Sequence, residues 1–260
     1  MSTALRLSRA LLAVLAVTVR AARAQPPAAY RDSTQPVETR VRDLLGRMTL
    51  DEKVAQLQSL HVQGRVLTGP DGRFSADSAA RRLLPGLGRI ERPSESTSGA
   101  RGAAAHAQFV NDVQRFLIEH TRLGVPALMH EEALHGFVAR DATSFPQAIA
   151  LASSWDPALL ERVFTAVAAE ARARGTHQVL APVVDVARDP RWGRIEETYG
   201  EDPYLVGRLG VAAVRGLQGR TGTVGPGHVI ATLKHMAGHG QPESGENTAP
   251  APFGERTLRE

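Results

Sequence analysis

The sequence contains no cysteine among its 260 residues, which excludes several kinds of chemistry at once. Disulfide bonds, thiolate nucleophiles and zinc sites with cysteine ligands cannot form. Hydrophobic residues make up 42% of the chain, which favours a folded protein over a disordered one. A chain of this length buries enough surface to fold without covalent cross-links.

Acidic residues are missing from the first 24 positions, which carry four arginines. Arg6 and Arg9 precede an apolar stretch at residues 10–19, and residues 22–24 read Ala-Arg-Ala. This layout is typical of a secretory signal peptide, so we expect a secreted or periplasmic protein that is cleaved after about Ala24. The apolar stretch is too short to span a bilayer as a helix, and no membrane span is expected in the mature chain.

The leader also accounts for the positive charge of the sequence. The whole chain has a formal net charge of +4, and the four leader arginines are not offset by any acid there. The mature chain is therefore neutral overall. Without a basic excess, the composition gives no support for a nucleic-acid partner.

Residues 25–36 are rich in proline and alanine and are expected to form a linker before one domain over residues 37–260. In that domain, helical periodicity alternates with short apolar runs. Asp156-Pro157 and Asp202-Pro203 each place a capping side chain before a proline that suits the first helical turn. Expected helices cover residues 37–47, 51–60, 103–123, 157–174 and 203–219. Expected strands cover residues 86–90, 127–129, 149–152, 179–186 and 228–233.

Apolar strands that alternate with helices are typical of a parallel α/β sheet covered on both faces. The pattern alone does not separate a doubly wound sheet from a barrel. Polar residues follow directly after three expected strands: Glu131-Glu132, residues 185–194 and Lys234-His235. In a (β/α)8 barrel such positions line one rim, where active sites are built.

No metal ion or other cofactor is expected. His130 and His135 are five residues apart, whereas zinc proteases place two histidines four apart on one helical face. His235 and His239 have that spacing, but the glycine between them makes a helix unfavourable. The stretch at residues 222–227 lacks the lysine of a phosphate-binding loop, and no Gly-x-Ser-x-Gly nucleophile motif occurs.

Four polar residues at strand ends form the candidate site: Glu132, Arg194, Lys234 and His235. A carboxylate accepts hydrogen bonds from two hydroxyls at once, arginine offers a rigid fork of donors, and lysine adds a movable cation. An imidazole donates to one further oxygen. If the strand ends converge, this set suits the binding of a neutral polyol.

Each of these residues also has a purely structural interpretation. Glu132 would cap the turn at Leu134, and Lys234 with His235 would be a solvated strand end. Arg194 would pair with a nearby carboxylate, from Glu196, Glu197 or Glu201. The residue types alone therefore predict a polar cleft without naming its ligand.

Six short motifs, taken together and in order, are more specific. They are Gly124-Val125-Pro126, His130-Glu-Glu-Ala-Leu-His135-Gly136, Phe145-Pro146-Gln147-Ala148-Ile149, Asp189-Pro190-Arg191-Trp192-Gly193-Arg194, Gly200-Glu201-Asp202-Pro203-Tyr204-Leu205 and Lys234-His235. In this order the motifs resemble the N-terminal domain of family 3 glycoside hydrolases, and the resemblance extends over about residues 37–260.

The resemblance implies a partial (β/α)8 TIM-like barrel, of which the chain holds roughly the first five to six βα units. Its rim would bind the non-reducing-end sugar of an oligosaccharide or aryl glycoside in the −1 subsite. Glu132 matches an acidic residue that binds the distal hydroxyls, and Arg194 matches the arginine of a Gly-Arg pair. Lys234 and His235 match a pair that holds equatorial hydroxyls, whereas Trp192 is expected to be structural.

Two features depart from the family pattern. Met236 stands where an aromatic residue is usual. The nucleophile Asp and the acid/base Glu, which retaining hydrolysis needs on either side of the bond, are expected beyond Glu260. We therefore expect no catalytic residue in this chain, little activity from it alone, and a partner in a missing C-terminal part of the same polypeptide. The alternatives are a non-catalytic carbohydrate-binding lobe, if Glu260 is the true end, and a different α/β-barrel hydrolase.

The resemblance also bears on the substrate. Many glucosidases of the family have a shorter Asp at the position of Glu132. The longer side chain leaves less room for the C6 hydroxymethyl group of a glucoside. A retaining, exo-acting β-xylosidase is therefore the first expectation, with β-glucosides and α-L-arabinofuranosides close behind.

Overall fold

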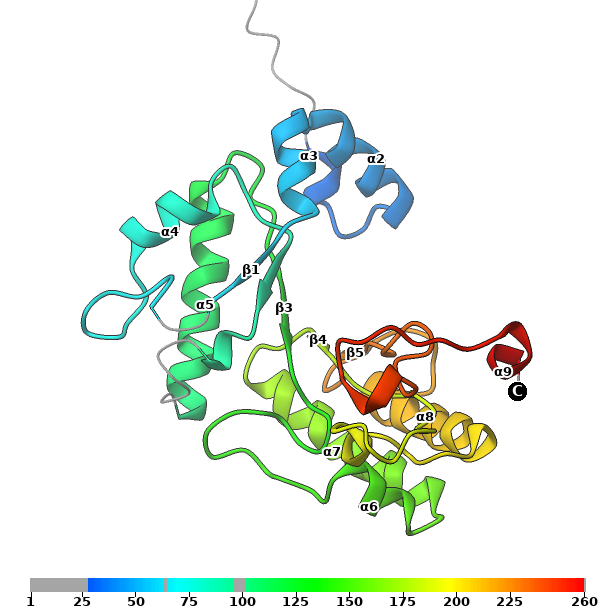
Figure 1. The fold of residues 1–260 in the computed structure, drawn as a ribbon. Coiled ribbons are helices and arrows are strands. Elements are labelled where there is room, and N and C mark those ends of the chain that lie inside the picture. The colour runs from blue at the N-terminus through cyan, green and yellow to red at the C-terminus, as the bar shows by residue number, and fades with distance from the viewer. Residues whose placement is uncertain (1–27, 63–64, 96–101, 260) are drawn as a thin grey trace, which may run out of the picture. The chain divides into compact units, whose positions relative to one another are not determined.

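The computed structural model describes residues 28–62, 65–95 and 102–259 (Figure 1). The predicted signal peptide and the start of the predicted linker lie outside these residues. Contacts divide the chain into two units, residues 1–50 and residues 51–260. The predicted domain start at residue 37 stays a prediction. Among the helices that the structure describes, none is both long and apolar enough to cross a membrane.

The first unit contains a short 3-10 helix, η2 (Ala29–Arg31), and the predicted helix α2 (Val37–Arg47). Two polar contacts hold them together. The backbone N–H of Tyr30 donates to Asp43 Oδ2 at 3.0 Å, and Arg40 Nε donates to the Tyr30 carbonyl at 3.2 Å. Helix α3 (Leu50–Gln56) begins at the boundary between the units.

The second unit is built on a sheet of five parallel strands in the order β1-β2-β3-β4-β5. The strands are β1 (Ser59–His61), β2 (Arg89–Glu91), β3 (Leu128–Glu131), β4 (Gln178–Val179) and β5 (Ile230–Ala231). Each strand pairs with the next one along the chain, and Ile90 of β2 lies between Leu60 and Met129. A doubly wound sheet reverses its strand order at a switch point, whereas a barrel does not. The sequential order therefore confirms the predicted α/β class and the first five strands of a TIM-like barrel.

Helices follow the strands as the alternation predicts. They are α4 (Ala76–Leu83), α5 (Ala103–His120), α6 (Ala148–Ala152), α7 (Pro157–Ala173), α8 (Pro203–Gln218) and α9 (Glu255–Arg259). Short 3-10 helices occur as η3 (Pro93–Glu95), η4 (Ile195–Glu197) and η5 (Glu243–Gly245). The two predicted caps are confirmed, because Asp156 accepts from the backbone N–H of Leu159 and Asp202 from that of Tyr204.

One predicted element was wrong, and two others end earlier than predicted. The run at residues 149–152 belongs to helix α6 and is not a strand. The helix expected to reach Leu60 ends at Gln56, and the residues that follow form β1. The strand expected over residues 179–186 ends at Val179. Pro182 has no N–H to donate to the neighbouring strand, which interrupts regular pairing there. Pairing resumes in a single bridge between Val183 and Lys234.

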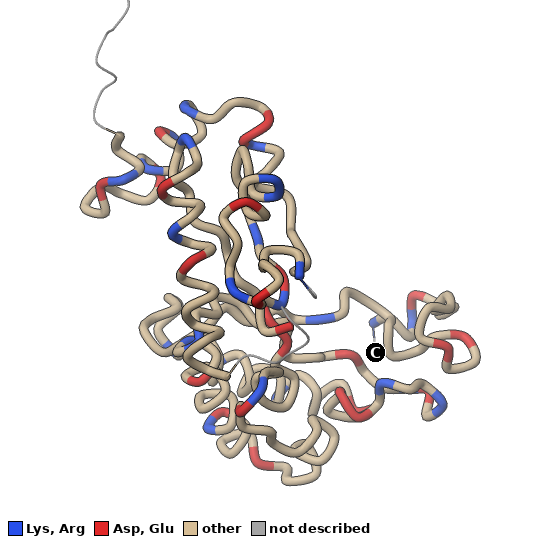
Figure 2. The backbone as a smooth tube through the Cα atoms, turned by 90° about the vertical axis from the view of Figure 1, so that its left-hand side faces the viewer, with Lys and Arg blue, Asp and Glu red and all other residues tan. Residues whose placement is uncertain are grey.

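Two hydrophobic clusters fix the sheet against its helices. One joins α4 and α5 to β2 and β3 through residues such as Leu83, Ile90, Phe109 and Met129. The other joins α6, α7 and α8 to β4, with Phe164 and Leu209 fully buried. Figure 1 shows α5 beside β1 and β3, and α7 and α8 near β4 and β5. Basic and acidic positions are interspersed along the described backbone (Figure 2).

Candidate functional site

The candidate residues lie where the parallel strands end. Arg92 follows β2, Glu132 follows β3, and Lys234 and His235 follow β5. Asp185 follows the irregular continuation of β4. Because the carboxyl ends of parallel strands meet at one edge of a sheet, side chains from distant parts of the sequence come together there.

Glu132 is held by two cations. Its Oε1 accepts from Arg92 Nη2 at 3.0 Å, and its Oε2 accepts from Lys234 Nζ at 3.1 Å. The side chains of Glu132 and Lys234 are only 18% and 14% exposed, so water screens their attraction weakly. Lys234 is therefore paired across the strand ends and is not simply solvated.

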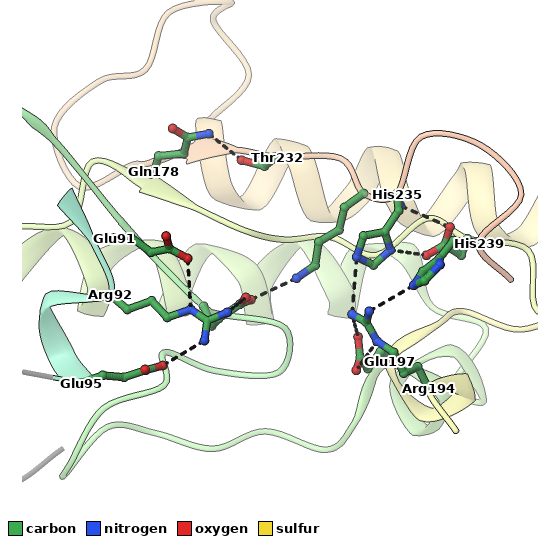
Figure 3. A network of polar contacts seen from close by, with 12 residues as sticks. Glu91, Arg92, Glu95, Gln178, Arg194, Glu197, Thr232, His235 and His239 are labelled. Carbon is green, nitrogen blue, oxygen red and sulfur yellow. Dashed lines mark hydrogen bonds and ion pairs between the residues drawn. The ribbon is translucent and has the colours of Figure 1, made fainter. Parts of the chain in front are cut away.

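Arg92 was not predicted from the sequence. Its guanidinium also donates from Nη1 to Glu95 at 3.2 Å, and its Nε lies 3.9 Å from a Glu91 oxygen. Figure 3 shows Arg92 between these two carboxylates. Partial burial opposes the charged form, but the charges of Glu132 and Glu95 outweigh it and raise the pKa of Arg92.

His235 is oriented by a buried carboxylate. Asp185 is 5% exposed; its Oδ2 accepts from His235 Nδ1 at 2.7 Å and its Oδ1 from the backbone N–H of His235 at 3.2 Å. Donation from Nδ1 leaves Nε2 as the acceptor nitrogen of a neutral ring. That nitrogen faces Arg194 Nη2 at 3.4 Å. Asp185 thus selects the tautomer of His235.

Arg194 forms a fork with Glu197, donating from Nε at 2.9 Å and from Nη2 at 2.7 Å. The structural pairing with Glu197 is therefore present. The same guanidinium also reaches two imidazoles, because Nη1 faces His239 Nε2 at 3.2 Å and Nη2 faces His235. Hydrogen bonds to Glu197 raise the pKa of Arg194 against its partial burial. The three labelled side chains Arg194, His235 and His239 point toward one another in Figure 3.

His239 packs beside Arg194 and His235. Its ring packs edge-on against Trp192 at 5.0 Å and against His235 at 4.4 Å. Burial lowers the pKa of His239, and the neighbouring His235 lowers it further. Trp192 is buried and donates from Nε1 to Asn247 at 2.9 Å, so it holds the loop that carries Arg194.

The histidines that the sequence placed near Glu132 point to separate partners. His130 Nε2 lies 3.4 Å from Ser59 Oγ, and His135 Nδ1 lies 3.0 Å from the Phe145 carbonyl. Over residues 28–62, 65–95 and 102–259, no group of three histidines or acids is arranged to hold a metal ion.

The arrangement combines firmly placed donors and acceptors from four strand ends. Carboxylates of Glu132 and Asp185 alternate with the cations of Arg92, Lys234 and Arg194. Sugar hydroxyls donate and accept, so such a set can bind several hydroxyls of one ring through charge-assisted hydrogen bonds. The four predicted residues lie in two adjoining groups of polar contacts, which meet at the neighbouring residues Lys234 and His235. Arg92 extends the group of Glu132 and Lys234, and Asp185, Glu197 and His239 extend the group of Arg194 and His235.

Comparisons with known proteins give a consistent family and fold for this chain. The family model described as the glycosyl hydrolase family 3 N terminal domain matches residues 49–260. A putative β-xylosidase of Formosa agariphila is 38% identical over 88% of this chain and 30% of its own length. A probable β-glucosidase C of Aspergillus flavus is 33% identical over 84% of this chain and 35% of its own.

Solved structures give the same result. A β-glucosidase from Erythrobacter marinus matches with a TM-score of 0.75 at 37% identity, over 88% of this chain and 30% of that one. An exo-1,3/1,4-β-glucanase from a Pseudoalteromonas species matches with a TM-score of 0.74 at 30% identity, over 85% of this chain and 27% of that one. The chain spans about a third of the length of the curated relatives above.

Proposed function

The chain belongs to glycosyl hydrolase family 3, and from this premise we propose that it supplies the sugar-recognition part of the active site of a retaining, exo-acting β-glycosidase. Glu132, Arg194, Lys234 and His235 would hold the hydroxyls of the non-reducing-end sugar. The observation that carries the proposal is the network at the strand ends. Lys234 bridges to Glu132 at 3.1 Å, while the adjacent His235 is fixed by Asp185 at 2.7 Å.

This network is suited to a neutral polyol because each of its cations already faces a carboxylate: Arg92 and Lys234 face Glu132, and Arg194 faces Glu197. Glu132 accepts from two cations, yet a carboxylate has capacity for further hydrogen bonds from hydroxyl groups. Lys234 has two more N–H donors besides the one that Glu132 accepts. Groups held in advance in this way lose little entropy when the sugar binds, and they keep their orientation in the transition state.

The bond-breaking groups are proposed to lie outside this set. Retaining hydrolysis uses two carboxyl groups about 5–5.5 Å apart, one as nucleophile and one as acid and base. The three carboxylates of the described site are already engaged: Glu132 by Lys234, Asp185 by His235, and Glu197 by Arg194. Each of these carboxylates thus holds a side chain that is proposed to contact the sugar, which is a role separate from attack on it.

The preferred substrate is proposed to be a β-xyloside, with β-glucosides and α-L-arabinofuranosides as weaker substrates. Glu132 is one methylene longer than aspartate, and Arg92 and Lys234 hold its carboxylate from two sides. The names of the relatives, a putative β-xylosidase and a probable β-glucosidase, support the first two of these substrates. The proposed leader further predicts that hydrolysis takes place outside the cytoplasm.

The test is the complete natural polypeptide that contains this chain, assayed against aryl β-xyloside, β-glucoside and α-L-arabinofuranoside. We expect the highest kcat/KM for the xyloside. Arg194→Ala should lower kcat/KM by roughly 10- to 150-fold, the equivalent of one hydrogen bond to a charged group. Arg220→Ala, which removes an exposed pair with Glu161, is the control and should leave kcat/KM unchanged.

The same assay on residues 25–260 alone tests where the nucleophile lies. We expect no useful turnover from this piece. Turnover that Arg194→Ala abolishes would contradict the placement of the bond-breaking groups outside the described site. A complete polypeptide that binds xylose without hydrolysing any of the three glycosides would instead support a carbohydrate-binding role.

A further inference from the structure

The residue before Glu132 is a buried acid that the proposed function does not use. Glu131 is 0% exposed; it accepts from the backbone N–H of Ser94 at 2.8 Å and from Ser94 Oγ at 2.6 Å. The buried imidazole of His106 lies 3.4 Å from the same carboxylate. Adjacent residues at a strand end point to opposite sides, so Glu131 anchors one side while Glu132 faces the site.

This anchor fixes the turn that carries Arg92. Arg92 lies between β2 and η3, and its own N–H donates to the His130 carbonyl at 2.8 Å. Its carbonyl accepts from the N–H of Glu95 at 3.0 Å. The backbone of Arg92 has a φ of +49°, a conformation that L side chains adopt only when their surroundings impose it. The bonds between Glu131 and Ser94 are part of those surroundings.

The same turn aims the guanidinium of Arg92 at Glu132. One amino group, Nη2, donates to Glu132, and the other, Nη1, donates to Glu95. Within the described residues Nε is buried and has no hydrogen-bond partner. The unsatisfied Nε is unfavourable, so the orientation of Arg92 must be imposed by its backbone and by the charges of the two carboxylates.

We propose that Arg92 is a specificity-determining positioning residue, which keeps the carboxylate of Glu132 extended over the space where a C6 hydroxymethyl group would lie. The inference rests on the proposed function and deepens it. Lys234 holds Glu132 by a point charge on a flexible stem, whereas Arg92 holds it by a planar group on a fixed turn. Loss of Arg92 frees Glu132 to rotate toward Lys234, and the site then admits the larger sugar.

The experiment compares Arg92→Met with wild type in the complete polypeptide. Methionine keeps an aliphatic stem and removes the charge. We expect KM for the aryl β-xyloside to rise about tenfold with a smaller change in kcat, the effect of one charge-assisted hydrogen bond on substrate positioning. The ratio of kcat/KM for xyloside over glucoside should fall by a similar factor. Arg220→Met is the matched control and should change neither quantity.

A double-mutant cycle separates this role from a general structural one. If Arg92 acts through Glu132, then Arg92→Met should have no further effect on the xyloside-to-glucoside ratio in a Glu132→Ala background. An Arg92→Met effect of equal size in both backgrounds would overturn the proposal, and so would an unchanged ratio in the wild-type background.

Two further variants keep the test decisive if Arg92→Met folds poorly. Arg92→Lys retains the charge without the fork, and Ser94→Ala removes one donor to Glu131. Both should lower the ratio by less than Arg92→Met, and a ratio equal to that of wild type in both would overturn the proposal. A wild-type polypeptide that hydrolyses neither glycoside refutes the proposed function and this inference together. Hydrolysis with a ratio that Arg92 does not influence refutes the inference alone.

Discussion

Asp185→Asn tests how the site fixes His235. Asp185 is buried at the end of the β4 run and accepts two hydrogen bonds from His235, one from the backbone and one from Nδ1. Asparagine fills the same space without the charge. When its carbonyl faces the backbone N–H, its amide nitrogen faces Nδ1 as a donor and favours the other imidazole tautomer.

The magnitude follows from the hydrogen bond that the substitution removes, the one that joins Nδ1 to Asp185. A hydrogen bond to a charged group contributes about 1.5–3 kcal/mol. In the wrong tautomer Nε2 carries a hydrogen and meets the N–H of Arg194, only 3.4 Å away, so two donors face each other. Together these effects should lower kcat/KM by roughly 30- to 150-fold, the equivalent of about 2–3 kcal/mol.

The assay is hydrolysis of the aryl β-xyloside by the complete polypeptide, with a thermal melt of each variant. Glu161→Gln makes the same carboxylate-to-amide change outside the site, where the half-buried Glu161 pairs with the exposed Arg220, and should stay within about twofold of wild type. His235→Ala should lose about as much activity as Asp185→Asn, and the double variant should lose little more. Equal activity of Asp185→Asn and Glu161→Gln would refute the role of Asp185.

Three other predictions concern different parts of the chain. Gly216→Ala should destabilise the second unit by about 1–3 kcal/mol, because its Cβ would lie 2.5 Å from a backbone oxygen of α7. Gly207→Ala on the same helix has open space around the new Cβ and should be neutral or stabilising. Chemical denaturation measures both free energies of unfolding. Folding lowers the pKa of His239 below its ordinary 6.5, so the folded state loses stability as the pH falls from that value toward the folded pKa. His239→Gln should therefore reduce the drop in melting temperature between about pH 7 and pH 5. An unchanged drop would contradict this prediction. Mass spectrometry of the exported protein should find Gln25 at its N-terminus, and an intact Met1 would rule out the predicted leader.

Local signals in the sequence predicted some elements well and others poorly. The caps at Asp156 and Asp202 located the starts of α7 and α8, because a capping side chain and a proline act within one helical turn. The apolar run at residues 149–152 was assigned to a strand, since a short apolar run has no period that separates strand from helix. β1 was missed because three residues, Ser59–His61, become a strand only by pairing with β2, which lies far along the sequence.

The site shows the same division between local and distant information. The strand-end positions of Glu132, Lys234 and His235 were predictable, because polar residues after apolar strands collect at one edge of a parallel sheet. Arg92 also comes just after an expected strand, but nothing in the sequence singled it out from its charged neighbours Arg89 and Glu91. Its role depends on a turn anchored by Glu131. The contact between His239 and Arg194 joins residues 45 positions apart and likewise follows only from the fold.

The proposed sugar site can be tested with a crystal structure of the complete polypeptide with xylose bound. We predict that the sugar lies at the carboxyl ends of the strands. Its hydroxyls should be within hydrogen-bond distance of Glu132, Arg194, Lys234 and His235, and the carboxylate of Glu132 should still contact Arg92. Xylose bound at another place, or bound without contact to these four side chains, would refute the proposed sugar site.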